Sequence, residues 1–151
     1  MTPVQCAYIA GIIDGEGAIC IAANNTVSYV PRINVGTVSK SLTDYLLRVF
    51  GGKVCPKRQK NPRAKDQWHW YLNGAEAIQL LTEIADYLVI KQLQARLVLA
   101  VSRFHSFTGK HARGISWTVQ ESAQAKEAKA TLHRLNVRGR IPAVSALPSS
   151  T

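Results

Sequence analysis

Acidic residues are scarce in this chain of 151 residues, which carries nine Asp and Glu against nineteen Lys and Arg. The formal net charge is therefore +10, and the pI is about 9.9. Such a balance favours a polyanionic partner, because every phosphate neutralised by Lys or Arg releases condensed counterions. Charge alone leaves two alternatives to a nucleic-acid partner. The positive charge could serve only to keep the protein in solution, or the protein could bind acidic protein or lipid.

The sequence also lacks long apolar runs and paired cysteines. No apolar stretch approaches the roughly 20 residues that span a bilayer, and the first residues lack the basic region of a secretory signal. Three cysteines, Cys6, Cys20 and Cys55, are odd in number and far apart, which argues against a disulfide framework or a structural zinc site. We expect a soluble intracellular protein without membrane association, from a bacterial or archaeal cytoplasm or an organelle.

Capping residues and periodicity predict the order of the elements. Helix starts are predicted at Thr2, Ser41, Asn73 and Thr118, each followed three residues later by an acid or amide. Apolar spacing predicts a further helix from about 90 to 107. Strands are predicted at 19–23, 28–38, 53–57 and 67–72, the second and the last with alternating side chains. This order predicts an α+β domain over residues 1–141, with helices on one face of a small antiparallel sheet and a frayed tail at 142–151.

Two acids, Asp14 and Glu16, stand out once the other seven are assigned. Three of those seven occupy predicted caps, three lie on predicted helix surfaces and one opens a strand. Asp14 and Glu16 fall where the first helix is expected to end, and negative charge there opposes the helix dipole. A local rule broken in this way indicates a functional or specially paired site, and Mg²⁺ requires oxygen ligands. Alternatively, both acids only solvate a helix end.

Small residues form a stripe on the same helix. Ala7, Gly11 and Gly15 recur every four residues, with Ala10 beside them. A glycine inside a helix costs about 1 kcal/mol relative to alanine, so Gly11 indicates close packing. Two copies of this helix around a two-fold axis would explain the stripe and would bring two Glu16 side chains together. Tight packing within one chain is the alternative.

The segment Ile9–Gly17 resembles the LAGLIDADG signature of homing endonucleases, with Gly15 and Glu16 in place of its last Ala and Asp. The similarity continues through Pro31–Val35, Phe50–Val54 and Ile90–Ala95, and so covers roughly residues 8–104. It implies an αββαββα core with a saddle-shaped antiparallel sheet, here followed by additional C-terminal helices. One signature per chain implies a homodimer on a nearly palindromic DNA site.

The resemblance also implies site-specific hydrolysis of double-stranded DNA, with Mg²⁺ or a similar divalent metal held by Glu16. Lys91 corresponds to a lysine near the cleaved phosphate, and Thr37 to a polar residue that orders solvent. Asp14 is expected to form hydrogen bonds at the dimer interface, together with Ala7, Ala10, Gly11 and Gly15. An intron RNA maturase and a non-cleaving DNA-binding regulator are the alternative functions, and the acid retained at position 16 favours cleavage.

Polar side chains of the strands would then face the DNA. Arg and Lys can read guanine and Asn and Gln adenine in the major groove. Residues 53–65 carry six basic side chains and no acid, which suits phosphate contacts, although a solvated basic loop is the alternative. The residues expected to contact DNA are Asn24, Ser28, Arg32, Asn34, Lys53, Lys57, Arg58, Gln67, His69 and Tyr71.

Overall fold

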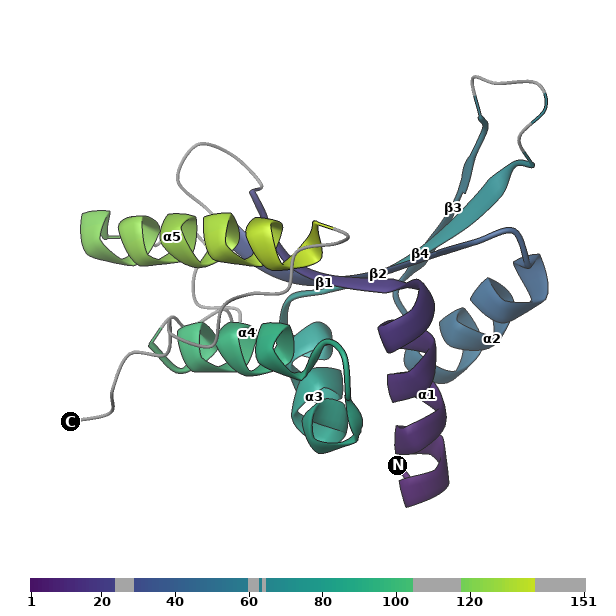
Figure 1. Cartoon of the computed structure of the whole chain (residues 1–151), viewed down its shortest axis with the longest axis horizontal. Helices are drawn as coiled ribbons and strands as arrows, with labels where there is room; N and C mark the ends of the chain where they lie inside the picture. The colour runs from purple at the N-terminus through teal and green to yellow at the C-terminus, as the bar shows by residue number, and fades with distance from the viewer. Residues whose placement is uncertain (24–28, 60–62, 64, 105–117, 138–151) are drawn as a thin grey trace.

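A computed structural model describes residues 1–23, 29–59, 63, 65–104 and 118–137. The chain order is helix, two strands, helix, two strands and helix, followed by a short 3₁₀ turn and two further helices (Figure 1). The predicted α+β class and its αββαββα order are therefore confirmed. The elements are α1 (Pro3–Glu16), β1 (Gly17–Ala23), β2 (Tyr29–Thr37), α2 (Lys40–Phe50), β3 (Lys53–Lys57), β4 (Gln67–Asn73), α3 (Gly74–Ile84), η1 (Ala85–Tyr87), α4 (Gln92–Phe104) and α5 (Val119–Asn136).

The four strands form one antiparallel sheet in the order β1-β2-β4-β3. Ile33 lies opposite Ile19 on one side and Leu72 on the other, and all three are buried. Arg32 and Asn34, the alternate residues of β2, are only half-buried. The predicted alternation is thus correct, and it gives the sheet one apolar face and one polar face.

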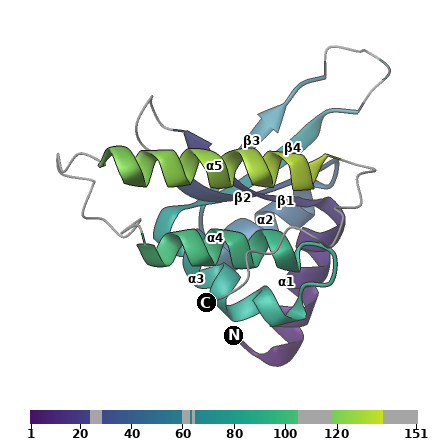
Figure 2. The same ribbon diagram turned by 60° about the vertical axis from the view of Figure 1, so that its left-hand side comes forward.

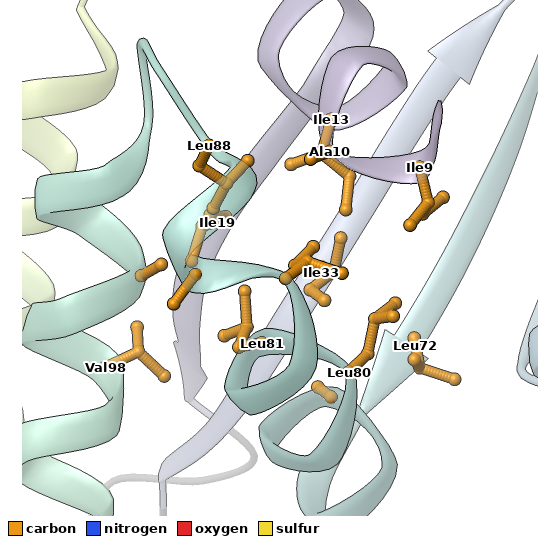
Figure 3. Close-up of a cluster of buried hydrophobic side chains, with 14 of the residues drawn as sticks. Ile9, Ala10, Ile13, Ile19, Ile33, Leu72, Leu80, Leu81, Leu88 and Val98 are labelled. Atoms are coloured by element: carbon orange, nitrogen blue, oxygen red, sulfur yellow. The ribbon is translucent and has the colours of Figure 1, made fainter. Parts of the chain in front are cut away.

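Helices α1 to α4 lie on the apolar side of the sheet, as Figures 1 and 2 show. The core is formed where α1, α3 and α4 meet the strands, and Figure 3 shows Ile13, Ile33, Leu81 and Val98 converging there. All four side chains are 0% exposed. Burying each such side chain contributes roughly 1.5–3 kcal/mol, so this contact holds α1 firmly against the sheet.

The predicted helix starts are confirmed at Thr2 and Thr118, where complete capping boxes begin α1 and α5. The start at Ser41 is wrong in detail, whereas Asn73 is the N-cap residue of α3 as predicted, although without the side-chain cap. Helix α2 already begins at Lys40, and Asp44 pairs with the Lys40 ammonium at 2.6 Å instead of capping the helix. The Asn73 side chain makes no cap hydrogen bond, because its oxygen accepts one from Arg32 across the sheet at 2.7 Å.

Helix α5 packs against β1, an edge strand, and against α4. Its buried residues are Ala125, Ala128 and Leu132. Near its end, the Asn136 amide donates to the carbonyl oxygen of Ile19 at 2.9 Å, which satisfies a backbone group of the edge strand. Among the described helices, none is long and apolar enough to cross a membrane. The tail predicted at 142–151 lies outside the described residues.

Candidate nuclease site and nucleic-acid interface

Glu16 is the last residue of α1, and β1 follows without a loop. Gly17 makes this junction possible, because a Cβ there would lie 2.8 Å from both Cα and O of Ile13. Gly15 has no such constraint and lies inside α1, which continues to Glu16. Glu16 is consequently exposed at the point where the helix meets the sheet.

Asp14 is held by the start of the segment that leads into α4. Its carboxylate accepts hydrogen bonds from the backbone N–H of Val89 at 2.7 Å and of Lys91 at 2.9 Å. In return, the Lys91 ammonium donates to the carbonyl oxygen of Asp14 near the end of α1. The acid thus stabilises amides near the N-terminus of α4, and the cation stabilises the C-terminus of α1, as the two helix dipoles require.

This pair of contacts, the Asp14–Lys91 clamp, explains why an acid stands at a helix end where the dipole disfavours it. Both carboxylate oxygens of Asp14 accept hydrogen bonds within their own chain, whereas the sequence led us to expect Asp14 to form hydrogen bonds at a dimer interface. The clamp joins α1 to the start of α4. It therefore holds Lys91 beside Asp14, which lies two residues before Glu16.

A pocket of about 420 Å³ contains both Glu16 and Lys91. An acid and a cation therefore share one solvent-accessible hollow. The remaining lining residues come from the end of α1 (Gly15), the start of β1 (Gly17, Ala18), the segment before α4 (Ile90), α4 itself (Gln94), and the end of α5 with the residue after it (Leu135, Asn136, Val137).

Two polar residues of this pocket were missed in the sequence. Gln94 is only 6% exposed although it is polar, and the Oδ1 atom of Asn136 is buried without a hydrogen-bond partner among the described residues. Gln94 lies three residues after Lys91, on the same helix face, which is a spacing that could have signalled it. Asn136 carried no such signal, since it reaches the pocket from the other end of the chain.

The chemistry of the pocket suits half of a divalent-metal site. A carboxylate oxygen is a ligand that Mg²⁺ and Ca²⁺ accept, and Glu16 is exposed to provide one. Within the described part of one protomer, however, no three His, Cys, Asp or Glu side chains lie close enough together to hold a metal ion. Further oxygen ligands would have to come from a second protomer, from water or from a phosphate.

Thr37 lies at the end of β2, on the side of the sheet where α1 enters β1, because Gly17 pairs with Val35. Its hydroxyl oxygen accepts a hydrogen bond from the Ser39 backbone N–H at 3.1 Å, just before α2. Thr37 is therefore near the end of the sheet at which Glu16 lies, but it does not line the pocket that contains Glu16 and Lys91.

The small-residue stripe of α1 is exposed in a single protomer. Ala7, Gly11 and Gly15 are all exposed, and a Cβ at either glycine would meet nothing within 4 Å. Packing within the chain therefore does not explain Gly11. Ala10 is an exception, because it is 0% exposed and belongs to the core, so its assignment to an interface is corrected.

The polar face of the sheet gathers most of the side chains that were expected to contact DNA. Asn34 lies opposite Tyr71, which in turn lies opposite Lys53, and Lys57 lies opposite Gln67. Directly opposite residues in an antiparallel sheet share a face, so the register joins these side chains, with Arg32 and His69, into one surface. Arg58 is exposed just beyond β3, whereas Asn24 and Ser28 lie outside the described residues.

Two titratable groups on this face have altered pKa values. Burial lowers the pKa of His69, and the nearby Lys57 cation lowers it further. Burial raises the pKa of the Cys20 thiol, against the opposite influence of Arg32 and Lys129. At neutral pH both groups are therefore uncharged, and the positive charge of the surface comes from its lysines and arginines.

Comparison with known proteins identifies the fold. No family model matches the sequence, and no curated protein matches it. Among solved structures, an archaeal intron-encoded homing endonuclease, I-Vdi141I complexed with DNA, is similar over 93% of this chain and 89% of its own, with 14% identity and a TM-score of 0.68. The homing endonuclease I-CvuI in complex with DNA is similar over 86% and 95%, with 18% identity and a TM-score of 0.52.

The LAGLIDADG meganuclease I-AabMI bound to uncleaved DNA is similar over 66% of this chain and 36% of its own, with 15% identity and a TM-score of 0.52. The chain therefore has the fold of the LAGLIDADG homing endonucleases, and the resemblance seen in the sequence is confirmed at the level of the fold.

Proposed function

We propose that this protein is a site-specific, divalent-metal-dependent DNA endonuclease that acts as a homodimer. One observation carries the proposal. The exposed carboxylate of Glu16 stands where the exposed small-residue stripe of α1 meets the sheet, in a pocket that it shares with Lys91. A metal-holding acid, a dimerisation surface and a basic sheet face are thus adjacent in one chain.

The polar face of the sheet is proposed to bind double-stranded DNA. It presents Arg32, Asn34, Gln67 and His69 beside the basic side chains of the edge strand β3, and strands fit the major groove. The net charge of +10 supports binding to phosphates. The fold neighbours I-Vdi141I and I-CvuI are both described as complexes with DNA.

The dimer is proposed to form through α1. Glycines at positions 11 and 15 allow a second backbone to approach closely, because neither would place a side chain in the way. Val4 and Tyr8 are 79% and 55% exposed beside them, which provides apolar surface for a second copy of the chain. A two-fold axis along this stripe would bring the two Glu16 carboxylates together and would present two sheet faces to inverted half-sites.

Each residue of the pocket then has a proposed task. Glu16 holds the divalent metal, which when bound polarises the scissile phosphate and lowers the pKa of a bound water. Lys91 places a positive charge in the same pocket, where it attracts the phosphate and stabilises negative charge that develops on its oxygens. Asp14 positions Lys91 through the backbone of residues 89–91. Mg²⁺ and Ca²⁺ are each present with the neighbour I-CvuI, which supports a divalent ion as the cofactor.

The test is cleavage of a genomic or randomised duplex library by the full chain in Mg²⁺, in parallel with Glu16→Gln. Discrete cut sites that disappear in Glu16→Gln while DNA binding persists are the expected result. Glu76→Gln is the matched control, because Glu76 is exposed on α3 and faces another pocket. Sequence-selective binding without cleavage by the unmodified chain would overturn the nuclease assignment in favour of a regulator, and selective binding of intron RNA would favour a maturase.

A further inference from the structure

His69 lies at the centre of the polar sheet face and contacts an amide on each side. Its Nδ1 atom is 3.3 Å from Oδ1 of Asn34, and its Nε2 atom is 3.3 Å from Oε1 of Gln67. Both contacts join a ring nitrogen to an amide oxygen. Only a doubly protonated imidazolium can donate to two oxygens at once, since a neutral ring has one N–H and one lone pair.

The neutral ring therefore requires one of the two amides to turn. An amide that rotates by half a turn keeps its shape but exchanges its oxygen for its NH₂ group. With neutral His69, one amide presents oxygen to the ring and the other presents NH₂. The second amide then directs its oxygen away from the ring, so the pair offers the solvent side one donor and one acceptor. With charged His69, both amides direct their NH₂ groups outward.

The imidazole ring of His69 is held in place. The exchange of oxygen for NH₂ therefore takes place by rotation of the amides and not of the ring. A Cβ on Gly36 would lie 3.1 Å from Cε1 and 3.2 Å from Nε2 of His69, so the imidazole lies directly over the glycine backbone. Tyr71 stacks beside it, with ring centroids 5.9 Å apart. Arg32 in turn lies 5.5 Å from the centre of the Tyr71 ring. Glycine at position 36 and the stacked neighbours thus fix one orientation of His69.

We propose that His69 is a specificity-determining residue whose protonation state selects which ends of the Asn34 and Gln67 amides face the DNA. This inference rests on the proposed DNA-binding function of the sheet. One donor beside one acceptor matches the major-groove edge of adenine, with its N6 donor and N7 acceptor. Two donors match guanine, whose N7 and O6 both accept. Protonation of His69 should therefore move the preference in each half-site from an adenine to a guanine.

The charges around the ring set the direction of the pH response. The titratable neighbours are Lys57 and Cys55 on β3, Tyr71 on β4 and Arg32 on β2. Burial and Lys57 lower the pKa of His69 in the free protein, so the neutral, adenine-preferring form dominates at pH 7.5. Phosphates of bound DNA favour the charged form, and acidification to pH 5.5 should populate it.

The experiment is a binding selection that is independent of cleavage. The full chain, with EDTA present, selects duplexes from a randomised library at pH 7.5 and again at pH 5.5, and the bound pools are sequenced. We expect one or two adjacent positions in each half-site to shift from adenine to guanine by about tenfold, the scale of one exchanged hydrogen bond to a base edge. His69→Gln should bind with a preference that is the same at both pH values. His133→Gln, which alters an exposed histidine of α5, should retain the shift.

A second measurement reads the switch in the free protein. With side-chain nitrogen labelling, the NH₂ signals of Asn34 and Gln67 should titrate with the same midpoint as the ring nitrogens of His69, and should not titrate in His69→Gln. Amide signals that ignore the ring titration, or a pH shift in base preference that survives in His69→Gln, overturn the inference. If the chain binds DNA sequence-selectively but its base preference is the same at both pH values, only this inference is overturned. If the chain binds no DNA sequence selectively, the proposed function is overturned as well.

Discussion

Replacing Asp14 by Asn would remove the charge from the Asp14–Lys91 clamp while keeping the shape of the side chain. The carboxylate accepts two backbone hydrogen bonds, at 2.7 and 2.9 Å, from the segment before α4. An amide can accept only with its oxygen, and its NH₂ group would face one of the two N–H donors. The substitution therefore leaves one backbone donor unsatisfied and weakens the other bond.

The expected loss of stability follows from the type of bond. A hydrogen bond to a charged group contributes about 1.5–3 kcal/mol when it is buried. Asp14 is half-buried, so we expect about 2 kcal/mol in total for Asp14→Asn. For a domain of this size, that corresponds to a fall in Tm of about 6 °C.

The assay is urea and thermal unfolding followed by circular dichroism at a fixed protomer concentration, because a dimer's stability depends on concentration. Asp44→Asn is the matched control. It removes an acid from an exposed pair with Lys40 at i and i+4, so it should cost less than about 0.5 kcal/mol. If Asp14→Asn were as mild as this control, the clamp would not hold α1 to α4 and the reasoning would be refuted. DNA cleavage should fall with the same substitution, because the clamp positions Lys91.

Three further predictions concern the interfaces and the pocket. Gly11→Leu should leave the monomer folded, because nothing within its chain meets the new side chain, but should block the α1 contact and convert dimer to monomer in sedimentation; an unchanged dimer would place the interface elsewhere. Cys55 is exposed and should react with a maleimide faster than the buried Cys6. A bound DNA duplex should protect Cys55 from labelling, because Cys55 lies opposite His69 on the sheet. Equal labelling of Cys55 with and without DNA would contradict the assignment of this face to DNA binding. Asn136→Ala should lower stability in urea by about 1 kcal/mol through loss of its bond to the edge strand, and a neutral result would show that α5 is held by its apolar residues alone.

Local patterns in the sequence identified most of the elements and the two faces of the sheet. The alternation of Arg32, Ile33, Asn34 and Val35 predicted which side chains pack and which face outward, because side chains of a strand point to opposite sides in turn. Capping boxes at Thr2 and Thr118 were visible because their partners lie three residues away. The exposed glycines of α1 were recognisable for the same reason, since a helix brings every fourth residue to one face.

What the tertiary structure decided involves partners that are distant in the sequence. Asp14 accepts hydrogen bonds from Val89 and Lys91, which follow it in the sequence by 75 and 77 positions. Asn136 donates to the carbonyl oxygen of Ile19, from which it is separated by 117 positions. Neither pairing has a local signal, because each depends on where whole helices dock against the sheet. Ala10 illustrates the same limit, since its place on the small-residue stripe was clear but its burial depended on the strands packed against it. The sequence by itself determined the elements and their polar or apolar faces, whereas packing between them decided that Asp14 is a clamp and that Glu16 shares a pocket with Lys91, Gln94 and Asn136.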